Sequence, residues 1–136
     1  MKEMVYRNRI ENGQAFIDML DEGVYKGVHY AMVSYGSHPC AYVQIPEGHK
    51  LYGISNEDEF ANIDCHGGIT YVSTTGLIKP SNENHRDGHW IGWDYAHGCD
   101  YTYLPFDFEI TNNDKKWTTE EIFEEVKDVI EQLIKS

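Results

Sequence analysis

The sequence predicts an α+β domain over residues 1–136, with a mainly antiparallel sheet, a short N-terminal helix and a long C-terminal helix packed on one face. Short β-type runs, separated by glycine, proline and polar breaks, recur through the middle of the chain. Apolar residues recur at helical spacing near the C-terminus. A chain of 136 residues fits one domain, so we expect a single core and a sheet of about four to six strands.

The first elements are expected in the N-terminal third of the chain. Residues 11–22 hold a few apolar side chains among polar ones, and Gly23 follows as a stop signal, which predicts the short helix. Two β-type runs come next, Val28–Tyr35 and Cys40–Ile45. The segment between them, Gly36–Pro39, breaks the pattern and predicts a hairpin.

Two further strands are expected later, over Gly68–Ser73 and His89–Tyr95. The polar segment Lys79–Gly88 separates them and predicts a long loop. Loops of this kind are either tolerated insertions or lids over a site, and the sequence leaves both alternatives open.

The C-terminal helix has the clearest signal. Thr118 and Glu121 have the spacing of a capping box, in which each residue satisfies a backbone N–H of the other. An apolar stripe follows, made of Ile122, Phe123, Val126, Val129, Ile130 and Leu133. Acidic residues occupy much of the opposite side. We therefore expect this helix to cover the sheet with one stripe and to expose an acidic face, mainly as scaffold.

The charge of the chain restricts its partners. Its 23 acidic residues against 11 basic ones give a net charge of −12. Direct binding to a nucleic-acid backbone requires clustered lysine and arginine, so we do not expect it. An acidic mimic that blocks a basic, nucleic-acid-binding host protein remains an alternative.

The cysteines and the N-terminus predict a cytoplasmic protein without a membrane partner. The three cysteines lack Cys-x-x-Cys spacing, which argues against a disulfide framework or a zinc knuckle. The N-terminal residues lack the apolar core of a signal peptide, and no apolar run approaches membrane-spanning length. Homo-oligomers are compatible with the sequence.

The segment from Asp64 to Tyr71 is the first of two that concentrate polar chemistry. His66 precedes Gly67 and Gly68, which permit positive φ and can expose backbone N–H groups to an anion or carbonyl. Thr70 follows on the same strand face as Gly68. A tight turn that carries a surface histidine is the alternative interpretation.

The segment from Trp90 to Asp100 is the second. Asp94, His97 and Asp100 are spaced three apart where a strand is expected to end, so their side chains can converge. A carboxylate beside an imidazole suits a divalent metal ion or a histidine acting as general base. A turn whose carboxylates cap backbone N–H groups is the alternative. The candidate metal ligands are Asp64, His66, Asp94, His97 and Asp100.

The neighbouring residues have weaker signals. Trp90 and Trp93 have odd spacing and should face opposite sides of a strand, so one belongs to the core and Trp93 is a candidate to stack on a ligand. Cys65 and Cys99 lie near these histidines, but nothing in the sequence marks either thiol as activated. The other histidines are scattered, and we assign them no site: His29, His38, His49, His85 and His89.

These two motifs, followed by the acidic amphipathic helix, resemble those of a family of small proteins encoded by bacteriophages and prophages. The family pattern is His-Gly-Gly-hydrophobic-Thr and then Gly-aromatic-Asp-x-Ala-His-x-Gly-Asp, and the match covers roughly residues 40–134. Tyr95 stands where the family has cysteine, so a thiol role beside Asp94 is not supported. Gly98 and Cys99 stand where the family has any residue followed by glycine. The resemblance implies a phage setting, hence the cytoplasm of a bacterial host, but no particular activity.

The expected function is binding of a nucleotide-derived small molecule in one pocket at the ends of the last two strands. Such a protein could act in counter-defence by sequestering a host immune signal. The expected ligand-binding residues are His66, Gly67, Gly68, Thr70, Trp93, Asp94, His97 and Asp100. The alternative is an enzyme, a metal-dependent hydrolase of such a nucleotide, with His66 and His97 as the catalytic candidates. A divalent metal ion is the candidate cofactor.

Overall fold

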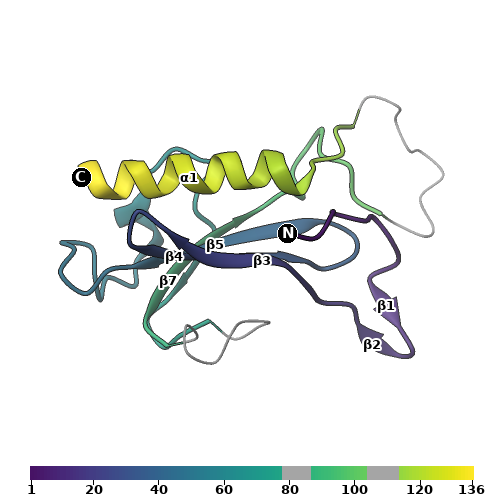
Figure 1. Ribbon diagram of the computed structural model, residues 1–136, viewed down its shortest axis with the longest axis horizontal. Helices are drawn as coiled ribbons and strands as arrows, with labels where there is room; N and C mark the ends of the chain where they lie inside the picture. Colours follow the sequence, from purple (N-terminus) through teal and green to yellow (C-terminus); the bar gives the residue numbers. More distant parts are fainter. Residues whose placement is uncertain (78–86, 104–113) are drawn as a thin grey trace.

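The computed structural model describes residues 1–77, 87–103 and 114–136. Within these ranges a five-stranded antiparallel sheet has the order β3-β4-β5-β7-β6, and α1 lies along one of its faces (Figure 1). The sheet strands are β3 (Asp18–Tyr25), β4 (Val28–Ser34), β5 (Pro39–Ile45), β6 (Tyr71–Ser73) and β7 (His89–Asp94). The remaining elements are β1 (Ile10–Glu11), β2 (Gln14–Ala15), the short 3₁₀ helix η1 (Glu57–Phe60) and α1 (Thr119–Lys135). The α+β class is confirmed.

The prediction of an N-terminal helix over residues 11–22 is wrong. β1 and β2 form a small hairpin there, and β3 begins at Asp18. Asn12 and Gly13 have φ angles of 52° and 78°, as the two-residue turn of a hairpin requires. β3 then pairs with β4 along its length. A few apolar residues at helical spacing are a weak signal, and the ladder with β4 overrides it.

The other expected strands are confirmed; three of them differ from the predicted bounds by one residue, and β6 is shorter by three. The predicted hairpin is formed by β4 and β5, whose register pairs Ser34 with Pro39. β6 starts at Tyr71 instead of Gly68, because Gly67 and Gly68 have φ angles of 71° and 78° that an extended strand does not permit. Residues 79–86 of the expected polar loop lie outside the described residues.

The C-terminal helix is confirmed, including its cap. The Thr118 side chain accepts from the backbone N–H of Glu121, and the Glu121 side chain accepts from the backbone N–H of Thr118. The apolar stripe is buried against the sheet except for Phe123, which is half-buried. No helix in the described part of the chain combines the length and apolar character needed to cross a membrane.

Successive residues of β7 face opposite sides of the sheet. Ile91, Trp93 and Tyr95 join the main core beneath α1, whereas Trp90 packs in a second cluster on the other side. Both tryptophans are buried, with 0% of Trp90 and 1% of Trp93 exposed. β7 therefore lies between two packed layers and ends at the point where the second polar motif begins.

Candidate functional site

The two polar motifs meet at one edge of the sheet. β6 and β7 are antiparallel neighbours, so the start of one lies beside the end of the other. The backbone N–H of Thr70 donates to the carbonyl of Gly92 at 2.9 Å and joins the segments before the strand begins. Lys115 and Cys99 also pair through their backbones, which brings the N-terminal end of α1 to the same place (Figure 1).

Asp100 is the centre of this region. Its side chain is only 2% exposed. Its Oδ2 atom accepts from His66 Nε2 at 2.6 Å and from the backbone N–H of His97 at 3.0 Å, and its Oδ1 accepts from Trp117 Nε1 at 2.9 Å. A buried carboxylate with three donors is a satisfied group that fixes the positions of its partners. We call His66, Asp94, Tyr95, His97, Asp100 and Trp117 the histidine cluster.

The pKa of Asp100 is lowered from its ordinary value of 3.8. Burial is the largest single influence and would by itself raise the pKa, because it disfavours the charged carboxylate. The hydrogen bonds from His66, the His97 backbone and Trp117 together outweigh burial. The carboxylate is therefore ionised at neutral pH and is available to hold an imidazole.

Aromatic rings fix the orientation of His66. Its ring stacks on Tyr95 with centroids 4.8 Å apart and planes 9° apart, and the Trp117 ring lies 4.9 Å away. Tyr95 is held in turn by Trp93, whose Nε1 donates to its hydroxyl at 3.0 Å, and by Glu125 of α1, which accepts from the hydroxyl at 2.5 Å. The His66 side chain keeps 22% of its surface exposed. It is thus positioned by the core and still reachable from outside.

His97 forms the second imidazole–carboxylate pair. Its Nε2 lies 3.3 Å from Asp94 Oδ1, and its ring meets the His66 ring at a centroid distance of 5.7 Å. This nitrogen is buried and makes no hydrogen bond to a described residue, so its approach to Asp94 is a close contact without a hydrogen bond. Asp94 Oδ1 also accepts from the backbone N–H of Ala96 at 3.1 Å. The alternative of a carboxylate-capped turn therefore coexists with the imidazole–carboxylate pair.

Gly67 provides the space for His97. A Cβ at this position would lie 2.1 Å from His97 Nε2, far closer than any real contact. A Cβ on Gly68 would meet nothing within 4 Å. The Gly68 N–H donates to the carbonyl of Cys65 at 2.9 Å. The glycines thus form a turn around an imidazole, and at least the Gly68 N–H is already engaged within the chain.

Asp64 lies apart from this cluster, whereas Trp93 supports it from the core. Asp64 is exposed, and its backbone N–H and carbonyl pair with the side chain of Gln132 on α1. Trp93 is 1% exposed and packs in the main core, where its Nε1 donates to the Tyr95 hydroxyl. Among residues 1–77, 87–103 and 114–136, no three His, Cys, Asp or Glu side chains are arranged to hold a metal ion.

Sequence reasoning missed the residues that hold the cluster from a distance. Trp117 lies just before α1 and Glu125 lies in its second turn, and the only signal for Trp117 is its place directly before the capping box. A concave site with a cavity of about 220 Å³ lies on the other side of Asp94, and Thr70, Trp93 and Asp94 of the predicted ligand-binding residues line it. We call this site the tyrosine pocket; it is lined by Tyr35, His38, Cys40, Tyr42, Thr70, Tyr71, Trp93 and Asp94. His38 was assigned no site, and a single histidine in a hairpin loop gives no local signal.

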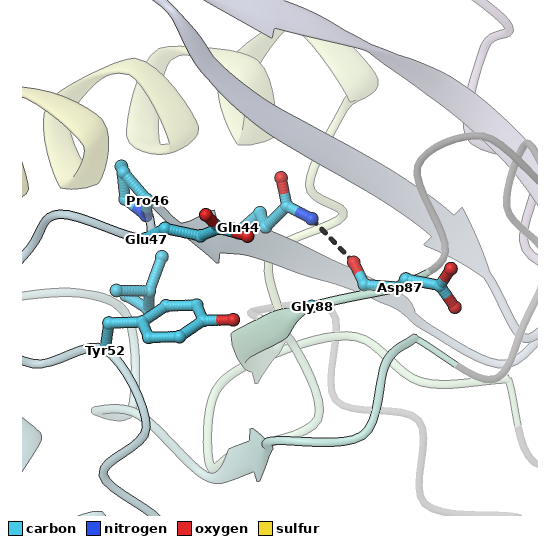
Figure 2. A pocket seen from close by; sticks show the side chains of 7 residues that line it. Gln44, Pro46, Glu47, Tyr52, Asp87 and Gly88 are labelled. Atoms are coloured by element: carbon cyan, nitrogen blue, oxygen red, sulfur yellow. Dashed lines mark hydrogen bonds between the residues drawn. The ribbon is translucent and has the colours of Figure 1, made fainter.

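A larger cavity, about 400 Å³, lies at the opposite end of β5 and β7. Figure 2 shows the Gln44 amide directed at the carbonyl of Asp87, to which it donates at 2.6 Å, with Glu47 and Tyr52 on the other wall. Gly88 has a φ of 104°, and a Cβ there would lie 2.7 Å from the Gln44 amide. The Gln44–Asp87 contact joins β5 to the segment before β7, and we assign the cavity no ligand.

The thiols have no feature of an activated nucleophile. Burial, followed by the nearby carboxylates of Glu125 and Asp64, raises the pKa of Cys65 to about 12. Burial also raises the pKa of Cys40. The described structure leaves all three cysteines free of disulfides.

Cys99 has a φ of 74°, in the left-handed region that favours glycine. Its side chain is exposed and its Cβ is strained there. We expect Cys99→Gly to raise the free energy of unfolding by up to about 1 kcal/mol, because the relieved strain exceeds the added freedom of the unfolded chain. Cys99→Ser, which keeps the Cβ, should leave it unchanged. Urea unfolding of both variants measures the difference, and an equal effect of the two would exclude strain as its cause.

No protein family model, curated protein or solved structure matches this chain. The features of this chain that bear on function are the geometry of the histidine cluster and the cavity beside it.

Proposed function

We propose that this protein binds a small nucleotide-derived molecule at the histidine cluster. One observation carries the proposal: His66 and His97 are in ring contact, each has its own carboxylate partner, and both remain partly exposed at one edge of the sheet. A structural histidine needs one partner and no exposed surface. Two oriented imidazoles side by side are suited to contact a ligand with several oxygens.

The chemistry of the pair fits phosphate and ribose. A protonated imidazole donates from both nitrogens, while a neutral one donates from one and accepts at the other. With Nε2 of His66 directed at Asp100, its other nitrogen is left to donate to a phosphate oxygen or to accept from a hydroxyl. Asp100 already has three donors. Its charge is therefore directed at the cluster itself and opposes an anionic ligand less than a free carboxylate would.

The resemblance to phage-encoded proteins gives this activity a setting. In the cytoplasm of a bacterial host, a protein that holds a nucleotide-derived immune signal would act in counter-defence. Sequestration requires tight binding and no turnover. A fixed pair of imidazoles supported by core residues such as Tyr95 meets that requirement.

Hydrolysis of the same ligand is the second candidate, and the 2.6 Å contact between His66 and Asp100 favours it. A carboxylate that orients an imidazole and fixes its tautomer is the usual support of a general base. A metal-dependent version would need ligands beyond those that the described residues bring together. The form of hydrolysis that the geometry supports is activation of water by His66.

The acidic-mimic alternative has less support. Several acidic side chains of α1 are already engaged within the chain: Glu121 with Lys115, Glu124 with Lys127, Glu131 with Lys26 and Glu125 with Tyr95. Exposed ion pairs are weak, yet they reduce the field that a basic partner would meet. Glu120 and Asp128 are exposed and serve as the test positions for this alternative.

Native mass spectrometry of the full chain, purified from phage-infected bacteria, should detect a bound small molecule that heat denaturation releases intact. The His66→Ala, His97→Ala variant should bind that molecule at least about thirtyfold more weakly, because two hydrogen bonds are lost and each costs about 1–3 kcal/mol. His49→Ala is the matched control, since His49 contacts the far end of α1 at the Leu133 carbonyl.

The control and a Glu120→Lys, Asp128→Lys variant should both bind normally. Unchanged binding by the double histidine variant, with folding verified by circular dichroism, would refute the site. Release of a cleaved molecule beyond stoichiometric amounts would favour hydrolysis. If only the Glu120→Lys, Asp128→Lys variant lost counter-defence activity, the acidic-mimic alternative would be favoured.

A further inference from the structure

The tyrosine pocket has the composition of a site for a planar ring. Tyr35 and Tyr42 join through their hydroxyls at 2.9 Å, and Tyr71 meets Tyr42 edge-to-face at a centroid distance of 5.2 Å. His38 lies 5.6 Å from the Tyr35 ring. Tyr42 is 6% exposed, so its ring is fixed by packing. Aromatic side chains held this way supply a rigid apolar wall at little cost in entropy.

The size of the cavity limits its occupant. A volume of about 220 Å³ is below the roughly 300–1,000 Å³ of pockets that enclose a whole drug-sized ligand. One ring system fits this space, and the rest of a larger molecule would have to lie outside it.

Asp94 joins this pocket to the histidine cluster. Its carboxylate lines the cavity and lies 3.3 Å from His97 Nε2. Its Oδ2 accepts only a long contact of 3.4 Å from the Thr70 hydroxyl, and an ionised carboxylate oxygen can accept more than one hydrogen bond. Oδ2 therefore has capacity for an N–H donor at the wall of an aromatic cavity.

No lysine or arginine lines the pocket, although Arg9 is close enough to affect the pKa of His38 and Tyr35. Burial lowers the pKa of His38, with smaller opposing contributions from carboxylates such as Asp94. The His38 ring is therefore mainly neutral at neutral pH. A carboxylate beside tyrosine rings then selects a ring that carries hydrogen-bond donors.

We propose that the tyrosine pocket takes the amino-bearing base of the ligand, with Asp94 accepting a hydrogen bond from the exocyclic amino group. This inference rests on the proposed function, in which the phosphate and ribose lie at His66 and His97. It assigns Asp94 a double role, as partner of His97 and as reader of the base. The ligand class is thereby narrowed to nucleotides of adenine, guanine or cytosine type.

The test uses probes that separate the base from the phosphate. NMR titration of the full chain with adenosine and with purine riboside compares two nucleosides that differ only in the amino group. We expect adenosine to shift tyrosine-pocket resonances and to bind about tenfold or more tightly than purine riboside, since a hydrogen bond to a charged acceptor has an effect of that size. Ribose 5-phosphate should shift His66 and His97 instead.

Variants test the assigned roles. Asp94→Ala should remove the preference for adenosine over purine riboside, a change that a merely structural carboxylate would not produce. Tyr71→Leu should weaken the binding of both nucleosides about tenfold, whereas Tyr71→Phe should bind them with normal affinity. Tyr52→Ala is the control, because Tyr52 lines the cavity at the opposite end of β7.

Three outcomes would separate the two proposals. Histidine shifts with ribose 5-phosphate, together with no nucleoside binding at the tyrosines, would overturn the base pocket and leave the proposed function standing. If the tyrosine pocket bound choline and no nucleoside, the base pocket would also be overturned, because the site would then be one for organic cations. Nucleoside binding in the tyrosine pocket without histidine shifts would support the pocket and refute the proposed function at the histidine cluster.

Discussion

Replacing Asp100 with asparagine is expected to lower the free energy of unfolding by about 1–3 kcal/mol at neutral pH. Asp100 Oδ2 accepts from both His66 Nε2 and the His97 backbone N–H, while Oδ1 accepts from Trp117. An asparagine has one acceptor oxygen, so its amide NH₂ must face at least one of these donors. The side chain is 2% exposed, and water cannot compensate for the lost contact.

The decrease in the free energy of unfolding caused by Asp100→Asn should depend on pH in a defined direction. The pKa of Asp100 in the folded state lies below its ordinary value of 3.8, so its carboxylate contributes stability that is fully present above that value. This contribution disappears as the pH falls through the lowered folded pKa. The difference between the native chain and Asp100→Asn should therefore be constant near neutral pH and shrink in acid below 3.8.

Urea unfolding of both proteins from neutral to acidic pH measures this dependence. Asp94→Asn is the matched control, because that carboxylate is 31% exposed and its contact with His97 is long, so its effect should be smaller. Equal effects of the two substitutions, or a difference that grows in acid, would contradict the central role of Asp100.

Gly67→Ala is expected to have the second large effect, on both stability and ligand binding. At a φ of 71° an added Cβ costs about 1–2 kcal/mol in backbone strain. The Cβ would also lie 2.1 Å from His97 Nε2, so the imidazole must move away from Asp94 and His66. Binding at the histidine cluster should then fall by at least as much as in a His97→Ala variant.

Gly68→Ala separates strain from contact. Gly68 has a similar φ of 78°, but an added Cβ there would meet nothing within 4 Å. It should therefore lose comparable stability in urea unfolding and still bind the ligand. If Gly68→Ala abolished binding as strongly as Gly67→Ala, displacement of His97 would not be the cause.

The elements that the sequence predicted correctly depend on short-range patterns. The capping box at Thr118 and Glu121 needs only residues three apart, and the stripe on α1 repeats within two turns. The hairpin of β4 and β5 follows from two strand-forming runs with a short break between them. The helix over residues 11–22 failed because the Asn12-Gly13 turn and the pairing of β3 with β4 outweighed a weak local pattern.

The pairing of residues within the histidine cluster, in contrast, could not be predicted from short-range patterns. The sequence grouped Asp64, Asp94 and Asp100 with the histidines as candidate ligands without pairing them, and in the structure His66 pairs with Asp100, 34 positions away. Trp93 is buried in the core and lines the tyrosine pocket, where Tyr35, Tyr42 and Tyr71 come together from separate parts of the chain. These pairings arise from the strand order that sets β7 between β5 and β6.

By itself, the sequence determined the fold class, most of the strands, the C-terminal helix and the two segments that carry polar chemistry. Strand patterns, turn residues and helix caps depend on residues only a few positions apart, so these features can be inferred from the local sequence. The tertiary structure decided which carboxylate holds which histidine, which aromatic rings are buried and where a cavity forms. Those choices depend on the docking of α1 on the sheet, because burial and electrostatic pairing act between residues that only the completed fold brings into contact.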